Sequence, residues 1–229
     1  MRVLLGPHTL PGDSSTKADI AGALAGREGL VVSLAEAGVT DLSRPITQAE
    51  VNLVREALVG QEVCRSRSWA REEAGGPVEA SLVGYVCGGV CDAWESAAVP
   101  HKADEPNTQV VAVADHVNLT WRSPLRGRND DSVGPRFPSM PHIYAPEVVR
   151  ERLSAQQGII VNLGVVAGVG CDERLDAFET ETVQASRYMA VSSELVPVAI
   201  VASHMGLRIA AAVVTKGKSP EEESGSGRS

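Results

Sequence analysis

Six segments of the chain are apolar almost throughout, and more polar stretches separate them. They read RVLL, LVVSLA, VEASLVGYV, TQVVAVAD, GIIVNLGVVAGV and LRIAAAVVT, at residues 2–5, 30–35, 78–86, 108–115, 158–169 and 207–215. Alternation of apolar and polar residues indicates a strand with one solvated face, whereas a continuous apolar run is typical of a strand covered on both faces. The pattern therefore predicts buried β-strands.

Helix signals occupy four of the stretches between these strands. Thr47 and Glu50 have the spacing of a capping box, and Gly60 is placed to end the same helix. The four segments are 47–60, 66–76, 145–158, which has Pro146 in its first turn, and 192–206, with Ser192 or Ser193 as N-cap. Strands that alternate with helices indicate an α/β fold with a largely parallel or mixed central sheet.

Composition supports one globular domain over residues 1–215 of the 229-residue chain. Hydrophobic residues make up 43% and charged residues 22%, which is ordinary for a soluble domain. Aromatic residues are only 3%, so we expect a core of Val, Leu, Ile and Ala. Residues 216–229 contain no apolar side chain that could pack, and we expect them to be disordered.

Charge and cysteine usage narrow the classes of partner. The net charge of −8 argues against nucleic acid and anionic membranes as partners, because both attract cationic surfaces. No signal segment and no apolar run of ~18 residues is present, so we expect a cytoplasmic protein. Cys64, Cys87, Cys91 and Cys171 lack metal-ligand spacing, so we expect buried reduced thiols and no metal.

The segment 115–146 has irregular spacing and four prolines between Trp121 and Tyr144, and so long an irregular stretch usually lines a site. It resembles the purine nucleoside phosphorylase family of the trimeric type. The matching residues are Asp115, His116, Val117, Asn118, Leu119, Pro124, Leu125, Gly127, Asn129, Asp130, Gly134, Arg136, Phe137, Pro138, Met140 and Tyr144. Segments 78–90, 177–184 and 192–215 are also similar to the family, in the right order, so the resemblance covers roughly residues 78–215.

This resemblance implies a phosphorylase-like three-layer α/β fold, in which helices flank a central mixed β-sheet. It implies an enzyme that cleaves the N-glycosidic bond of a purine nucleoside, either a 6-oxopurine nucleoside or a modified one. Inorganic phosphate would be the co-substrate, free base and ribose 1-phosphate the products, and no cofactor would be needed. It also implies a cyclic homo-oligomer, a trimer, whose subunits share active sites.

Family motifs also suggest which residues bind the nucleoside. Glu179 corresponds to the carboxylate that accepts a hydrogen bond from the N1–H edge of the base, and Phe178 to the ring that packs on it. Phe137 corresponds to the ring that reaches a neighbouring subunit's sugar. Tyr85, Val86 and Cys87 occupy the family's Asn-Ala-Ala turn. The alternatives are a solvated helix face for Glu179 and an ordinary core position for Phe137. We interpret His116 and Asn118 as structural residues that order the loop after the strand.

The phosphate site departs from the family. Candidate phosphate ligands are Ser14 and Ser15 in a Gly/Ser-rich segment with Gly6, His8 and Gly12, the backbone of Val86, and Ser193. The family's Arg-x-His-x-Tyr-Glu-Gly run has no counterpart, although Arg65, Arg67 and Arg71 lie nearby, and the family's C-terminal His-bearing segment is missing.

Glu194 aligns with the family's phosphate-binding hydroxyl, unless the alignment shifts by one residue to Ser193. Two like charges ~4 Å apart cost about 4 kcal/mol at an effective dielectric of ~20, which is enough to prevent useful phosphate binding. Three alternatives therefore follow: a phosphorylase, a hydrolase with Glu194 as general base, or a non-catalytic purine-binding relative.

Overall fold

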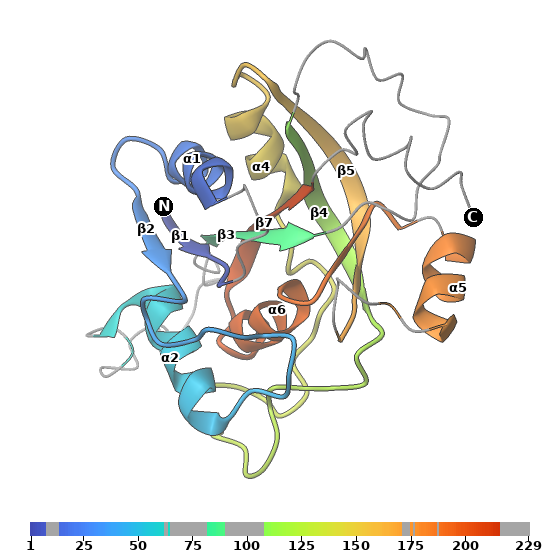
Figure 1. Ribbon diagram of the computed structural model, residues 1–229. Coiled ribbons are helices and arrows are strands. Elements are labelled where there is room, and N and C mark those ends of the chain that lie inside the picture. The colour runs from blue at the N-terminus through green and yellow to red at the C-terminus, as the bar shows by residue number, and fades with distance from the viewer. Residues whose placement is uncertain are drawn as a thin grey trace.

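A computed structural model describes residues 1–7, 14–61, 64, 82–89, 108–170, 175, 177–186 and 188–215 (Figure 1). The helix expected over 66–76, the tail 216–229 and the first part of the strand expected over 78–86 lie outside the described residues. The structure therefore tests the five other predicted strands, the later part of that one, and three of the four predicted helices.

A seven-stranded mixed sheet forms the middle of the fold, in the order β2-β1-β3-β7-β4-β5-β6. Every strand pair is parallel except β4 with β7, which is antiparallel. The strands are β1 (Arg2–Leu5), β2 (Leu30–Ser33), β3 (Leu82–Gly89), β4 (Thr108–Asn118), β5 (Ile159–Gly168), β6 (Ala190–Ser192) and β7 (Arg208–Thr215). The predicted α/β class with a mixed sheet is confirmed. Among the described elements, the three-residue strand β6 and the helices over Ser14–Ala25 and Ala177–Ser186 were not anticipated.

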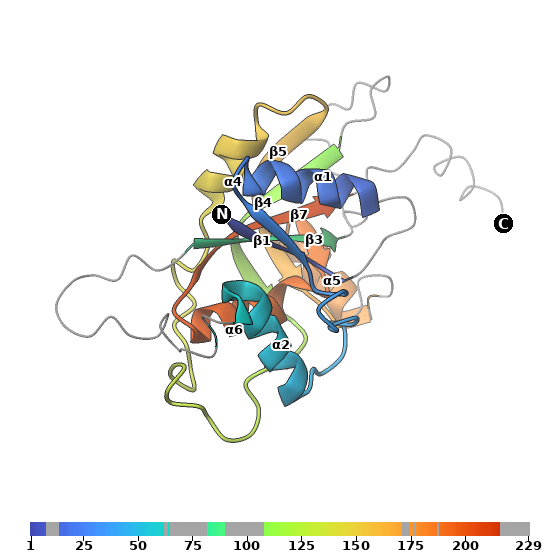
Figure 2. The same ribbon diagram turned by 90° about the vertical axis from the view of Figure 1, so that its left-hand side faces the viewer.

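Helices cover both faces of the sheet, so the fold has the three layers that were predicted (Figures 1 and 2). Helices α1 (Ser14–Ala25) and α4 (Pro146–Leu153) pack on one face, where Ile20 and Leu24 join Val3 and Val86 in one apolar cluster. Helices α2 (Gln48–Val59) and α6 (Leu195–His204) pack on the other face. Helix α5 (Ala177–Ser186) lies near the β5–β6 end of the sheet (Figure 1).

The ends predicted from the sequence are confirmed for one helix and differ from the structure in two others. The capping box of Thr47 and Glu50 at the start of α2 is confirmed, and Gly60 is the C-cap. Helix α6 takes Glu194 as its N-cap, so the prediction of Ser192 or Ser193 in that position is wrong. Ser192 is instead the last residue of β6, and its hydroxyl accepts a hydrogen bond from the Glu194 N–H. Helix α4 ends at Leu153, several residues before the glycine expected to end it.

The sheet curls so that β6, at the end of the strand order, also lies against β3. A Cβ atom on Gly89 would lie 2.6 Å from the carbonyl oxygen of Val191, so the close approach of the two strands requires glycine at this position. The carboxyl ends of β3, β5 and β6 therefore meet in one place, although their segments are distant in the sequence.

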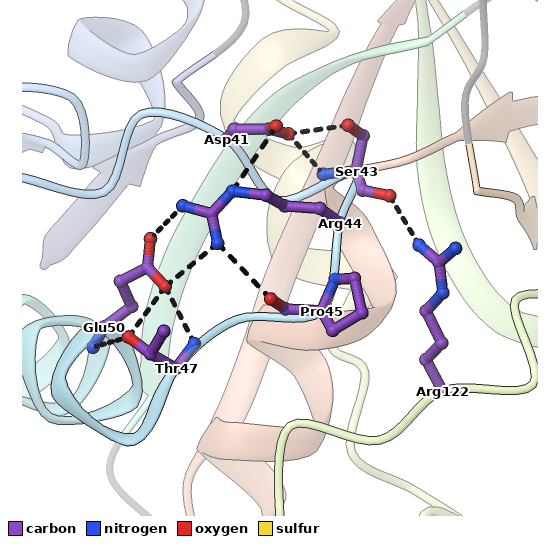
Figure 3. Close-up of polar contacts among 7 residues, drawn as sticks. All are labelled: Asp41, Ser43, Arg44, Pro45, Thr47, Glu50 and Arg122. Atoms are coloured by element: carbon purple, nitrogen blue, oxygen red, sulfur yellow. Dashed lines mark hydrogen bonds and ion pairs between the residues drawn. The ribbon is translucent and has the colours of Figure 1, made fainter.

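An arginine cluster holds the loops beside this edge (Figure 3). The Arg44 guanidinium donates to Glu50 at 2.5 Å and lies 3.7 Å from Asp41. Arg122, in the irregular segment after β4, donates to the carbonyl oxygen of Ser43 at 2.8 Å. Hydrogen bonding from Arg44, followed by that from the backbone of Thr47, lowers the pKa of Glu50 from 4.5 to about 2.

A pH titration tests this cluster. Because folding lowers the pKa of Glu50, its ionised form stabilises the fold fully above pH 4.5, and this contribution is lost as the pH falls towards 2. We expect Arg44→Gln to reduce the loss of stability over this interval, as measured by urea unfolding midpoints at several pH values. Arg27→Gln, at an exposed position, should keep the pH dependence of the wild type, whereas equal slopes for wild type and Arg44→Gln would contradict the interpretation.

Candidate active site

A buried carboxylate lies at the carboxyl ends of β1 and β3. The Glu194 side chain is 0% exposed, and its Oε2 accepts a hydrogen bond from the N–H of Gly88 at 3.0 Å. Gly6, directly after β1, donates its N–H to the Val86 carbonyl oxygen at 2.8 Å, which keeps the two strand ends side by side. A Cβ atom on Gly6 would lie 2.7 Å from Oε2 of Glu194, so the carboxylate rests directly against this glycine.

Ser192 connects the end of β3 with the end of β5. Its hydroxyl donates to the Gly88 carbonyl oxygen at 2.9 Å and accepts from the Glu194 N–H at 3.2 Å. Its own carbonyl oxygen accepts a hydrogen bond from the Val169 N–H at 3.2 Å. These bonds fix the backbone that presents Glu194, because both sides of the turn between β6 and α6 are tied to neighbouring strands.

Tyr85 and Cys87 line the buried side of this arrangement. The Tyr85 hydroxyl donates to the carbonyl oxygen of Glu194 at 3.3 Å, and the Cys87 sulfur lies 3.7 Å from the Ser192 hydroxyl. Burial, and after it the charge of Glu194, raises the pKa of Tyr85 well above its usual value. The phenol therefore stays protonated and remains a hydrogen-bond donor. Cys87 is a buried free thiol, as expected, whereas Cys64 is a free thiol that is only partly buried; Cys91 and Cys171 lie outside the described residues.

Glu179 reaches the same edge of the sheet from the β5 side. It lies in the first turn of α5, and its Oε1 accepts a hydrogen bond from the Gly170 N–H at 3.3 Å. Gly170 follows Val169, and the Val169 N–H donates to the Ser192 carbonyl oxygen. A short series of hydrogen bonds and backbone therefore connects Glu179 with the turn that carries Glu194. Glu179 is partly buried, whereas the adjacent Phe178 is 57% exposed.

The other residues predicted to bind a ligand differ in how far they are buried. Phe137 is 86% exposed, so the alternative that it is an ordinary core residue is wrong. The Val86 side chain is buried in the cluster on the α1 face, which leaves only its backbone for a ligand. Ser193 is buried, and its hydroxyl has no hydrogen-bond partner among the residues that the structure describes. Ser15 is exposed at the start of α1. His8, Gly12, the Ser14 side chain, Arg65, Arg67 and Arg71 lie outside the described residues.

His116 and Asn118 have the structural surroundings that the sequence suggested. Asn118 accepts a hydrogen bond from the Thr120 N–H at 3.0 Å and donates to the Arg122 carbonyl oxygen at 2.9 Å. The His116 Nδ1 lies 2.7 Å from the Tyr144 hydroxyl. Burial lowers the pKa of His116, although Asp115 opposes this effect, so the imidazole is neutral at pH 7.

Two features of the site region were not anticipated. The hydrogen bonds of Ser192 carry no sequence signal, because they depend on the curl of the sheet. Lys17 is 2% exposed and lies on the buried stripe of α1 with Ile20, Ala21 and Leu24. The spacing i, i+3, i+4 and i+7 of these four residues could have revealed a lysine on an apolar helix face.

Within the described residues, no helix has the length and hydropathy needed to cross a bilayer. In the same part of the chain, no three His, Cys, Asp or Glu side chains group as metal ligands would.

A glycine substitution tests the contact between β1 and Glu194. In Gly6→Ala the new methyl group would press on Oε2 of Glu194 and lie 3.1 Å from the Cys87 Cβ. We expect a loss of about 1–3 kcal/mol in the free energy of unfolding, measured by urea denaturation. Gly22→Ala is the control, since a Cβ there meets nothing within 4 Å inside a helix and should stabilise by about 0.5–1 kcal/mol. Equal effects of the two substitutions would contradict the contact.

Comparison with known proteins agrees with the motifs. No family model matches the chain. Purine nucleoside phosphorylase 1 of Bacillus subtilis (strain 168) is 28% identical over 122 residues, which cover 50% of this chain and 45% of that protein. Purine nucleoside phosphorylase of Mus musculus is 33% identical over 116 residues, 45% of this chain and 39% of that protein. The match thus spans less than half the length of these curated relatives.

Among solved structures, purine nucleoside phosphorylase of Schistosoma mansoni in a complex with BCX-34 has a TM-score of 0.45 and 17% sequence identity. The superposition covers 59% of this chain and 50% of that chain. The similarity to curated sequences confirms the prediction from the motifs: the chain resembles the purine nucleoside phosphorylase family.

Proposed function

We propose that the chain binds a purine nucleoside at the carboxyl ends of the strands, beside Glu194, and cleaves its N-glycosidic bond with water. Similarity to purine nucleoside phosphorylases supports a purine nucleoside as substrate. The observation that carries the choice of water is the position of the Glu194 carboxylate, buried against Gly6 and bonded to the N–H of Gly88.

Phosphate would compete with this carboxylate for the same place. Backbone N–H groups at strand ends are ligands that suit an anion, and here the Gly88 N–H is already bonded to Glu194. A phosphate bound there would have to displace the carboxylate or lie beside it as a second negative charge. Either arrangement is costly in a buried site, because the local dielectric is low. Water carries no charge and avoids this cost.

Hydrolysis assigns a role to each of the two carboxylates. Glu194 removes a proton from a water molecule as the water oxygen bonds to C1′ of the ribose. The bond between C1′ and the base nitrogen breaks, its electron pair leaves with the base, and a proton then returns to the base. Glu179 accepts a hydrogen bond from a ring N–H of the base and so orients it. The products are free base and ribose.

A product assay separates this proposal from its two rivals. With inosine and guanosine, we expect release of free base without phosphate, and Glu194→Gln should lower kcat by about 10²- to 10⁴-fold. The amide can still accept the Gly88 N–H but cannot take a proton, so purine binding should persist. Base release only with phosphate, together with ribose 1-phosphate, would support phosphorolysis, as the resemblance implies. Purine binding without release would support a non-catalytic relative.

A second substitution tests the base side. Glu179→Gln should weaken binding of a 6-oxopurine by about 10- to 100-fold, because a charge-assisted hydrogen bond contributes about 1.5–3 kcal/mol. Glu181→Gln is the matched control, since Glu181 lies on the same helix and is exposed. Calorimetric titration with hypoxanthine measures both variants. Indistinguishable affinities would place Glu179 on a solvated helix face instead.

A further inference from the structure

Arg55, His204 and Asn129 form a buried chain of hydrogen bonds that joins three elements. Arg55 lies on α2, His204 is the last residue of α6, and Asn129 belongs to the irregular segment after β4. The Arg55 guanidinium lies 3.2 Å from Nδ1 of the His204 ring, and Nε2 of the ring lies 3.3 Å from Oδ1 of Asn129. Arg55 is 6% exposed and His204 is 1% exposed, so little water competes for these bonds.

The proton arrangement along this chain is fixed by its two ends. A guanidinium can only donate, so Nδ1 of His204 must accept from Arg55. The neutral ring then carries its hydrogen on Nε2, which donates to Asn129. The amide of Asn129 presents its oxygen to the ring, because its nitrogen donates to the Gly134 carbonyl oxygen at 2.9 Å and to the Asp131 carboxylate at 2.7 Å. The chain is therefore complete only when His204 is neutral.

The irregular segment rests directly on the end of α6. A Cβ atom on Gly134 would collide with the carbonyl oxygen of His204, so the backbone of the segment touches the helix here. The hydroxyl of the neighbouring Ser203 donates to the Ser139 carbonyl oxygen at 2.8 Å. Residues 129–139 are thus held on the helix end through His204 and the residue before it.

Charges around the ring decide how it responds to acid. Arg55 faces the ring from α2 and Asp130 faces it from the irregular segment, whereas Glu194 is at the opposite end of α6. Burial, and after it the charge of Arg55, lowers the pKa of His204. A hydrogen bond with the Gly134 backbone and the charge of Asp130 oppose this effect and are the weaker causes.

We propose that this chain of bonds is an acid-sensitive latch: neutral His204 holds residues 129–139 on the end of α6, and a proton taken up by Nδ1 releases them. The new N–H would face the guanidinium of Arg55 at hydrogen-bonding distance, so that two donors and two positive charges oppose each other. The released segment carries Phe137, so release would also lower nucleoside cleavage; this last clause alone rests on the proposed function.

The direction of the pH dependence follows from the lowered pKa. The latched form binds the proton less readily than the released form, whose ring has the ordinary pKa of 6.5. The stabilisation by the latch is therefore complete above pH 6.5 and is lost as the pH falls below this value. The Glu50 cluster does not interfere, because its own loss of stability begins only below pH 4.5.

Hydrogen–deuterium exchange measured by mass spectrometry tests the latch without any activity. After correction for the intrinsic effect of pH, residues 129–139 should exchange about tenfold faster at pH 5 than at pH 7.5, while β4 and β5 change little. His204→Gln should show no such difference, because an amide does not take up a proton in this range. His142→Asn is the control: it removes an exposed histidine of the same irregular segment, and asparagine tolerates the φ of 66° found there.

Exchange that does not depend on pH in the wild type would overturn the proposal, as would a wild-type response in His204→Gln. An equal rise in β4 and β5 would also overturn it, because this pattern indicates unfolding of the whole chain. Should His204→Gln fail to fold, an NMR titration of the wild-type ring decides. We expect the hydrogen on Nε2 at pH 7.5 and a titration midpoint below 6.5 that coincides with release; a hydrogen on Nδ1, or midpoints that differ, would contradict the latch.

Discussion

The hydrogen bond from the Gly88 N–H to Glu194 is the interaction on which the site depends. It can form only because three separate conditions hold at the strand ends. Gly6 leaves room for the carboxylate, Ser192 fixes the turn before α6, and the curl of the sheet brings β6 against β3. A negative charge is thereby built into the chain at a place where strand-end N–H groups suit an anion. The proposed choice of water over phosphate at these strand ends follows from this charge.

Most of the fold could be predicted from the sequence, because it rests on local patterns. Continuous apolar runs identified six strands, and the capping box of Thr47 and Glu50 set the start of α2. Strand β6 was missed because three residues are too few to give a pattern. The start of α6 was misplaced because serine is a common N-cap, whereas here Ser192 bonds to β3 and to the Glu194 N–H. Tertiary contacts outweighed the local preference.

The site was predictable only where a motif carried it. Family similarity identified Glu179 and Glu194, and the conflict between Glu194 and phosphate was evident from charge alone. The contact with Gly6 was not, because it joins residues 188 positions apart that meet only after the sheet has formed. Lys17 was overlooked for a different reason: a single lysine does not disturb the composition of a helix, and the burial of its side chain is a property of the packed structure.

Strand β7 has a consequence for how the chain can fold during its synthesis. It is the last of the described strands to be translated, yet it lies between β3 and β4. Among the described strands, its two ladders alone join β2-β1-β3 to β4-β5-β6. Until residues 208–215 leave the ribosome, β2-β1-β3 and β4-β5-β6 have unpaired inner edges. Such edges invite pairing with other chains. A nascent chain that stalls before β7 should therefore be a substrate for chaperones.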